Sequence, residues 1–362
     1  MSDTEKKAYE PMDIRTVLEH AVRKDVKDIF VVAGLPITFK IGNVQERMDR
    51  PRMLPADISL CVDDIYELSG RAKTNLEKGI DDDFSFALAG TGRFRVNVFR
   101  QRGSLAAVIR VIRFGLPDPA ELSIPESVLS LADTKKGLVL ITGSAGSGKS
   151  TTLACMIDRI NHTREAHIIT MEDPIEYIHQ HKRSIVTQRE ISIDTPGYME
   201  SLRSALRESP DVILLGEMRD YDTVSAAITS AETGVLLLST LHTSSAANTI
   251  NRILDVFPAG QQQQVKIQLA QMLKGIVCQQ LVPGVDGSLI PAFEIMKSTT
   301  AIQNMIRESK LHQLESAMQA GAAEGMITMD GSLLKLYKEG RISRDTALIS
   351  CANYENMVKR LG

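Results

Sequence analysis

Four short segments in the middle of the chain are almost wholly apolar, and helix-like stretches follow them. Their sequences are GLVLITG, HIITMED, DVILLGEM and GVLLLSTLH. Strands in which apolar and polar residues do not alternate are covered on both faces, which is typical of a parallel sheet packed between helices. The pattern therefore predicts an α/β core with a parallel sheet.

The first of these segments runs into a loop with the pattern G-x-x-x-x-G-K-S, and the helix-like stretch TTLACMIDRI follows it. Between a strand and a helix, such glycines let backbone N–H groups surround a phosphate, and the helix N-terminus adds its positive dipole end. Lys149 would reach the β- and γ-phosphates of ATP, and Ser150 would bind Mg²⁺. A chance match is the alternative, which the position between strand and helix disfavours. The residues expected to hold the nucleotide are Gly143, Ser144, Ala145, Gly146, Ser147, Gly148, Lys149, Ser150 and Thr151.

Two of the other apolar segments end in side chains that could act on a bound triphosphate, because ligands bind beyond the carboxyl ends of strands in such sheets. Glu217 follows DVILLG without a Walker-B aspartate, so we expect it to be the general base that polarises the attacking water. The alternative for Glu217 is a surface ion pair. His242 ends the fourth segment and would either sense the γ-phosphate or pack as a hydrogen-bonded histidine at the strand end.

Three carboxylates follow the second apolar segment. Glu172 and Asp173 end the strand, Pro174 prevents it from continuing, and Glu176 lies one turn further on. Carboxylates beside a phosphate site suggest a cation, so we expect Glu172, Asp173, Glu176 and Ser150 to coordinate Mg²⁺, partly through water. A solvated acidic turn is the alternative.

The remaining sequence predicts three further regions around this core. Ahead of it, DIRTVLEHAVRK has the spacing of an amphipathic helix, VDDIYELSGRAKTNLEKG is helix-like, and IFVVAG, TFKIG, GRFRVNVFRQ and AAVIRVIR are strand-like. After it, QQQQVKIQLAQMLKGIVCQQL and later segments are helix-like, with SLIPAFEIM as one extended piece. The predicted divisions are a small α+β domain over 1–113, a proline-rich linker over 114–125, the core over 126–290 with helices from about 259, and a helical region over 291–362.

Composition excludes several classes of protein. The 42 Lys and Arg residues balance 45 Asp and Glu residues, and aromatic residues are only 4% with no Trp. A nucleic-acid translocase would need a basic surface or aromatic stacking platforms, so this rival is disfavoured. The start MSDTEKKAYE has no apolar signal core and no segment has the length of a membrane span, so we expect a cytoplasmic protein without membrane insertion. The four scattered cysteines indicate reduced, mostly buried thiols.

The four motifs GSAGSGKST, MEDPIEYIH, DVILLGEMRD and STLHTSSAANTINRILDVFP together resemble those of the secretion-type hexameric ATPases of type IV pili and type II secretion. TQREISIDT, AIQNMIRESK and GMITMDGSLLKLYKEG narrow the resemblance to the pilus retraction ATPases. The resemblance covers nearly the whole chain. It implies a PAS-like N-terminal domain and a RecA-like P-loop ATPase core, with the motifs serving as Walker A, Asp box, Walker B and His box.

The same resemblance implies a homohexameric motor that hydrolyses ATP and withdraws pilin subunits during twitching motility. The implied partners are an inner-membrane pilus platform protein and a second retraction ATPase, at the inner face of the cell membrane. Assembly ATPases of the superfamily typically carry a tetracysteine zinc module, and this chain has no paired cysteines, which favours retraction. A pilus assembly or type II secretion ATPase, or an accessory ring without motor activity, remains the alternative.

In ring ATPases a positive charge from across the cleft stabilises the transferring phosphoryl group. Arg95 and Arg110 have a spacing similar to the arginine pair of secretion ATPases, and we expect them to act in catalysis, with Arg113 and Arg207 as further candidates. The alternative is that the small domain only displays arginines on its exposed sheet face. Because the linker would let the first domain pivot, nucleotide binding would select between an open and a closed arrangement.

Overall fold

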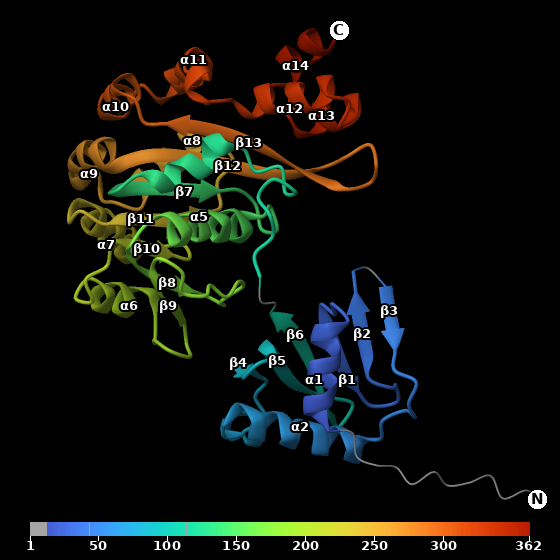
Figure 1. Ribbon diagram of the computed structural model, residues 1–362. Helices are drawn as coiled ribbons and strands as arrows, with labels where there is room; N and C mark the ends of the chain where they lie inside the picture. Colours follow the sequence, from blue (N-terminus) through green and yellow to red (C-terminus); the bar gives the residue numbers. More distant parts are fainter. Residues whose placement is uncertain (1–12, 43, 113–114) are drawn as a thin grey trace, which may run out of the picture. The chain divides into compact units, whose positions relative to one another are not determined.

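The computed structural model describes residues 13–42, 44–112 and 115–362. The chain forms two compact units that divide between Gly115 and Leu116 (Figure 1). Each unit has its own sheet and its own hydrophobic core. The first unit ends at Gly115, two residues beyond the expected end of the N-terminal domain at residue 113, and the domain assignment itself stays a prediction.

The first unit is an antiparallel sheet with the strand order β3-β2-β1-β6-β5-β4 and helices packed on it. The predicted amphipathic helix is α1, and its apolar positions Ile14, Val17, Leu18 and Ala21 are buried. The elements of this unit are α1 (Ile14–Arg23), β1 (Asp28–Val32), β2 (Thr38–Ile41), β3 (Val44–Arg47), α2 (Pro55–Ser69), α3 (Thr74–Glu77), β4 (Asp82–Leu88), β5 (Gly92–Gln101) and β6 (Ser104–Ile112).

The sequence suggested that the stretch VDDIYELSGRAKTNLEKG is helical. In the structure it is not one helix. Helix α2 begins earlier, at Pro55, and ends before Gly70, whose φ of 64° is left-handed. A glycine in that conformation is a common helix terminator, because it has no Cβ to oppose the left-handed backbone. Only the short helix α3 follows it in this stretch.

The second unit is a sheet with the order β13-β12-β7-β11-β10-β8-β9, parallel except for the β12–β13 pair. The predicted parallel sheet is thus confirmed. The elements around the nucleotide loop are β7 (Gly137–Thr142), α5 (Lys149–Thr163), β8 (His167–Glu172), β9 (Ile185–Glu190), α6 (Tyr198–Ala205), β10 (Val212–Leu215), α7 (Tyr221–Glu232), β11 (Leu236–Leu241), α8 (Ala246–Asp255) and α9 (Ala259–Met272). The remaining elements are α4 (Glu126–Leu129), η1 (Ser130–Asp133), β12 (Leu273–Pro283), β13 (Leu289–Lys297), α10 (Thr300–Arg307), η2 (Leu311–Gln313), α11 (Leu314–Ala320), η3 (Ala322–Glu324), α12 (Met329–Lys338), α13 (Arg344–Ser350) and α14 (Tyr354–Leu361).

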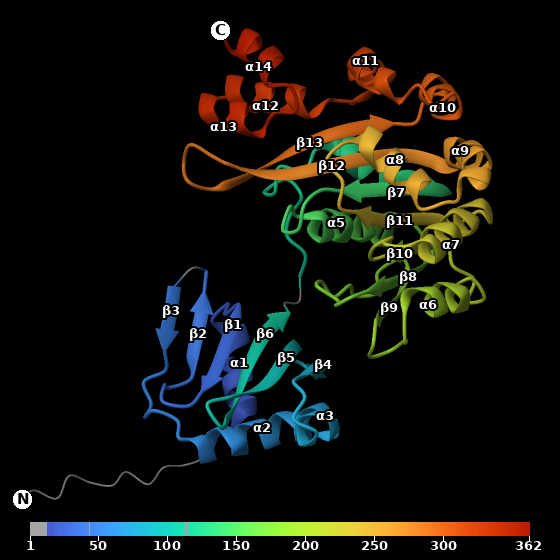
Figure 2. The same ribbon diagram turned by 180° about the vertical axis from the view of Figure 1, so that it is seen from behind.

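Helices cover both faces of this sheet, as the apolar strands require. Along β7, Leu138 and Leu140 belong to the core shared with α7, α8 and α9, whereas Val139 and Ile141 belong to the core shared with α5. Alternate side chains of a strand point to opposite faces, so a strand buried on both faces is apolar throughout. Helices α10 to α14 lie along the β13 side of the sheet in both views (Figures 1 and 2).

Strand β12 corrects the sequence-based expectation. QQQQVKIQLAQMLKGIVCQQL was expected to be helical throughout, but α9 ends at Met272 and residues 273–283 form β12. This strand pairs with β7 on one side and β13 on the other, and Ile276, Val277 and Cys278 are buried. Pairing on both edges outweighs the local preference for a helix. The predicted core boundary at residue 290 also falls inside β13.

The predicted linker is not a free tether over most of its length. Residues 116–125 belong to the second unit, where Ile124 is buried in a core and the Arg341 guanidinium donates to Ser123 Oγ over 3.0 Å.

All four cysteines are free, and three of them are buried, as expected. Across the described part of the chain, no helix has both the length and the apolar character needed to cross a bilayer.

Candidate nucleotide site

The glycine-rich loop joins the end of β7 to the start of α5, at the carboxyl edge of the sheet. Gly143 has a φ of +145°, and a Cβ there would lie 2.1 Å from the Gln279 carbonyl oxygen of β12. Gly148 precedes the helix with a φ of +89°, and a Cβ there would lie 2.8 Å from Gln279 Nε2. Both positions therefore require glycine, and the loop rests against β12.

Lys149 begins α5 and folds back into the loop. Its Nζ donates to the carbonyl oxygens of Gly143 at 2.9 Å and Ser144 at 2.8 Å. Burial lowers the pKa of Lys149, and the carboxylates of Glu217 and Glu176 oppose that shift. A phosphate would replace the carbonyl oxygens with charged acceptors, which bind an ammonium group more strongly.

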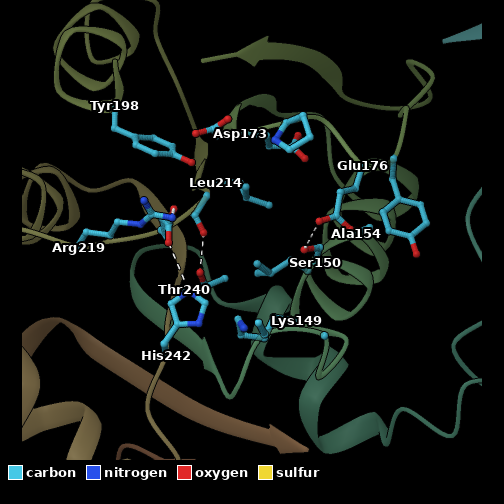
Figure 3. Close-up of a pocket in the computed structure, with 18 of the residues that line it drawn as sticks. Lys149, Ser150, Ala154, Asp173, Glu176, Tyr198, Leu214, Arg219, Thr240 and His242 are labelled. Atoms are coloured by element: carbon cyan, nitrogen blue, oxygen red, sulfur yellow. Dashed lines mark hydrogen bonds and ion pairs between the residues drawn. The ribbon is translucent and has the colours of Figure 1, made fainter. Parts of the chain in front are cut away.

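The strands β7, β11, β10 and β8 are adjacent, and their carboxyl ends surround a pocket of about 290 Å³. Figure 3 shows Arg219 and His242 on one side of this pocket, Ser150 and Glu176 on the other, and Lys149 between them. Of the residues expected at the site, those lining the pocket are Ala145, Gly146, Lys149, Ser150, Glu172, Asp173, Glu176, Glu217 and His242. The sheet thus brings together the ends of all four apolar segments.

Glu217 lies in the wall of the pocket with a side chain that is only 12% exposed. Its Oε1 is 2.5 Å from Arg219 Nη2, and its Oε2 is 3.4 Å from His242 Nε2. The hydrogen bond to Glu217 raises the pKa of Arg219. Glu217 is therefore in an ion pair with an exposed arginine, as its alternative interpretation expected, but its carboxylate lines the pocket. His242 is exposed and lines the pocket, so it is not packed inside the fold.

The acidic residues differ in their surroundings. Glu172 is half-buried and accepts hydrogen bonds from Thr170 Oγ1 at 2.7 Å and Gln188 Nε2 at 3.2 Å. Burial raises the pKa of Glu172 to about 7. Asp173 and Glu176 are exposed, and Glu176 Oε1 accepts from Ser150 Oγ at 3.1 Å.

A Mg²⁺ ion bound with a nucleotide fits these residues. Among the described residues, no group of three or more His, Cys, Asp or Glu side chains is close enough to hold an ion alone. Ser150 and Glu176 nevertheless place two oxygen ligands beside the loop that would hold phosphates. Mg²⁺ usually takes one or two protein oxygens together with substrate phosphates and water, which agrees with this arrangement.

The remaining predicted residues lie elsewhere. Arg95 Nη2 is 2.6 Å from Asp83 Oδ2 in the first unit, and Arg110 Nε is 2.9 Å from Asp28 Oδ1. These two arginines face each other across the β5–β6 pair. Their catalytic role stays a prediction. Arg207 is exposed beyond α6 and does not line the pocket, and Arg113 lies outside the described residues. Gly143, Ser144, Ser147 and Gly148 of the loop, and Thr151 of α5, do not line the pocket.

Sequence reasoning missed four residues that shape the pocket. Arg219 and Tyr198 approach the end of β10, where a Cβ on Gly216 would lie 2.7 Å from Tyr198 Oη. Tyr177 Oη is 2.9 Å from Thr151 Oγ1. His179 is buried in the pocket wall, and burial lowers its pKa to about 4. The MEDPIEYIH and GEMRD motifs contain three of them, but nothing in the sequence signals Tyr198.

Comparison with known proteins identifies the family. A family model described as type II/IV secretion system protein matches residues 4–320. The type IV pilus retractation ATPase PilT of Pseudomonas aeruginosa is 43% identical over 336 residues, which cover 93% of this chain and 97% of that protein. A twitching motility protein of Neisseria gonorrhoeae is 43% identical over 88% of this chain and 85% of that protein.

A solved structure is similar over almost the whole chain. The crystal structure of the pilus retraction motor PilT with bound ADP matches with a TM-score of 0.88 at 44% identity, covering 96% of this chain and 99% of that one. The fold and the site define an α/β P-loop protein of the secretion ATPase class. The chain belongs to the type II/IV secretion system protein family, and the resemblance seen in its sequence motifs is confirmed.

Proposed function

We propose that this chain is an ATPase whose homohexameric ring powers type IV pilus retraction and twitching motility. The single observation that supports it best is the pocket that places Lys149, Ser150 and Glu217 around one space at the carboxyl edge of the sheet. The relatives that cover nearly the whole chain are named as a retraction ATPase and a twitching motility protein.

In this proposal the loop binds the phosphates through its backbone N–H groups, and Lys149 exchanges its carbonyl partners for phosphate oxygens. Ser150 and Glu176 would hold Mg²⁺, with Glu172 and Asp173 acting through water. Bound Mg²⁺ supplies charge neutralisation at the β- and γ-phosphates. Glu217 would accept the proton of the attacking water, and His242 would respond to the γ-phosphate.

Arg95 and Arg110 would stabilise the transferring phosphoryl group from a neighbouring subunit or domain. To do so, they would break their ion pairs with Asp83 and Asp28. The matched control is Arg100→Ala, because Arg100 is an exposed arginine on the same strand as Arg95. We expect Arg95→Ala and Arg110→Ala to reduce turnover with little change in nucleotide affinity, whereas Arg100→Ala changes neither. Equal turnover in all three variants would contradict the assignment.

The rest of the machine is also a proposal. The first unit would be PAS-like, the second RecA-like, and the ring would act on an inner-membrane platform protein from the cytoplasmic side. A second retraction ATPase would share the task. Nucleotide binding would do work by favouring one of two arrangements of the units, which requires different affinities for ATP in the two arrangements.

The direct test measures ATP turnover and molecular mass in solution for the purified wild type beside Glu217→Gln. We expect a hexamer in both and a large loss of turnover in the variant. A protein that stays monomeric at every concentration and still hydrolyses ATP at full rate would refute the ring.

A deletion strain separates retraction from the alternatives of assembly, secretion or an accessory ring. Loss of a retraction motor leaves pili on the surface and removes twitching, whereas loss of an assembly motor removes the pili. Normal pili together with normal twitching would contradict the proposed role.

A further inference from the structure

The carboxylate of Glu217 has both oxygens engaged in this structure. Arg219 Nη2 is 2.5 Å from Oε1, and His242 Nε2 is 3.4 Å from Oε2. The Arg219 contact is the shorter and is charged at any physiological pH, because a guanidinium does not lose its proton. The guanidinium competes with a water molecule for Oε1 and offsets its charge, so Oε1 is a poorer acceptor for water while this contact lasts.

The backbone around Arg219 is fixed on both sides. The N–H of the preceding residue, Met218, donates to the Thr240 carbonyl oxygen at 3.1 Å, and Met218 is buried. The following residue, Asp220, caps α7 by accepting the N–H of Thr223 at 2.8 Å. Glu217 can therefore be separated from Arg219 by rotation of the Arg219 side chain, without movement of the loop.

Rotation of Arg219 changes its contact with water only a little, because its side chain is already 73% exposed. The Glu217 side chain, in contrast, is 12% exposed. An ion pair with so exposed an arginine contributes little stability. A phosphate competes well for the same guanidinium, since it accepts two parallel charge-assisted hydrogen bonds. Among the described residues that line the pocket, only Lys149 and Arg219 carry a permanent positive charge.

We propose that Arg219 is a positioning residue that holds Glu217 while the pocket is empty and exchanges it for a phosphate oxygen when ATP enters. The exchange leaves Glu217 with its His242 contact and frees Oε1 for the attacking water. No bond is formed or broken other than hydrogen bonds and the ion pair. This inference rests on the proposed ATPase function, and it adds a condition: Oε1 of Glu217 is released from the guanidinium only after ATP has bound.

The test is a double-mutant cycle on binding, which does not depend on turnover. The dissociation constant of adenylyl imidodiphosphate with Mg²⁺ is measured for the wild type, Glu217→Gln, Arg219→Gln and the double variant. Glu217→Gln removes the competitor for Arg219 and also removes repulsion between two anions. Removal of the competitor tightens binding only when Arg219 is present, whereas removal of the repulsion does not need Arg219. Measuring the effect of Glu217→Gln with and without Arg219→Gln therefore separates the two.

We expect Glu217→Gln to tighten binding about fivefold more when Arg219 is present than in the Arg219→Gln variant, which is the upper end of the range for an exposed ion pair. Arg219→Lys keeps the charge without the planar fork and should retain part of this difference. Arg344→Gln is the matched control, because Arg344 is an exposed arginine at the start of α13. In the Arg344→Gln variant, Glu217→Gln should change the dissociation constant by the same factor as it does in the wild type.

An effect of Glu217→Gln that is equal with Arg219 and with Arg219→Gln would overturn the exchange. Melting temperatures without nucleotide show whether each variant is folded, and the Lys variant keeps the test open if Arg219→Gln does not fold. A wild type that neither binds the analogue nor hydrolyses ATP would refute the proposed function itself. If the wild type binds the analogue and hydrolyses ATP, but Glu217→Gln changes the dissociation constant by the same factor with Arg219 and with Arg219→Gln, only the exchange is refuted.

Discussion

The hydroxyl of Thr152 donates to Gln279 Oε1 over 2.7 Å, although the two residues are 127 positions apart in the chain. Thr152 lies in the first turn of α5, and Gln279 lies on β12. Both are buried. The backbone carbonyl of the same Gln279 is the group that a Cβ on Gly143 would meet. One residue of β12 therefore supports the nucleotide loop at both ends.

Replacing Gln279 with Leu should weaken the loop and the fold together. The Thr152 hydroxyl would lose its acceptor inside the protein, which costs about 1–3 kcal/mol. We expect a lower melting temperature and a higher dissociation constant for ADP. Gln280→Leu is the control, because the Gln280 side chain donates to the Ser350 carbonyl oxygen and not to the loop. An ADP affinity that falls equally in both variants would argue against this support.

Gly143→Ala should abolish nucleotide binding. The new Cβ would lie 2.1 Å from the Gln279 carbonyl oxygen and 2.6 Å from Ser147 Oγ, so the loop must move. Gly234→Ala is the control, since Gly234 also has a positive φ, +101°, but no atom within 4 Å of a Cβ. The control should cost only the backbone strain, about 1–2 kcal/mol. The measurements are unfolding in denaturant and titration with ADP. Retained affinity in Gly143→Ala would show that the loop is not held by this contact.

Lys149→Met should lose nucleotide binding without loss of stability. In the absence of phosphate, burial of the ammonium group is unfavourable, as the lowered pKa of Lys149 indicates. We expect the variant without nucleotide to melt at the same temperature as the wild type or above it. ADP should raise the melting temperature of the wild type alone, because a ligand stabilises only the state that binds it. A clearly destabilised variant would mean that the contacts to the Gly143 and Ser144 carbonyl oxygens outweigh the burial.

Glu172 should make stability depend on pH. Its pKa is raised from 4.5 to about 7, so the folded state holds this proton more tightly than the unfolded state. The free energy of unfolding therefore falls as the pH rises from about 4.5 to about 7, and this contribution is constant above that range. Glu172→Gln should flatten the pH dependence of the melting temperature by a few degrees. The exposed Glu324→Gln is the control and should keep the wild-type slope.

Local sequence was sufficient for the parts of the site that depend on neighbours along the chain. The glycine-rich loop lies between β7 and α5 as predicted, Glu172 ends the buried strand β8, and Glu217 and His242 follow buried strands. Parallel strands end at one edge of a sheet, so the sequence order of strand and polar residue already indicated that these side chains would meet. The burial of β7 on both faces was likewise visible in its composition.

Other features could not be predicted in this way. Residues 273–281 were expected to continue a helix, and their pairing with β7 and β13 makes them a strand. The hydroxyl of Tyr198 reaches Gly216 from α6, and no motif marks it. The pairing of Arg219 with Glu217 involves neighbours in a known motif, but their contact depends on side-chain directions that sequence spacing does not specify.

By itself, the sequence predicted a phosphate-binding loop on a parallel sheet, because glycine conformations, apolar strands and strand-end carboxylates are local properties. Only the tertiary structure showed that Gln279 supports the loop from β12 and that the exposed Arg219 forms an ion pair with Glu217, the expected general base. The first depends on a contact between elements far apart in the chain, which forms only when the sheet has brought them together. The second depends on side-chain directions that sequence spacing does not specify.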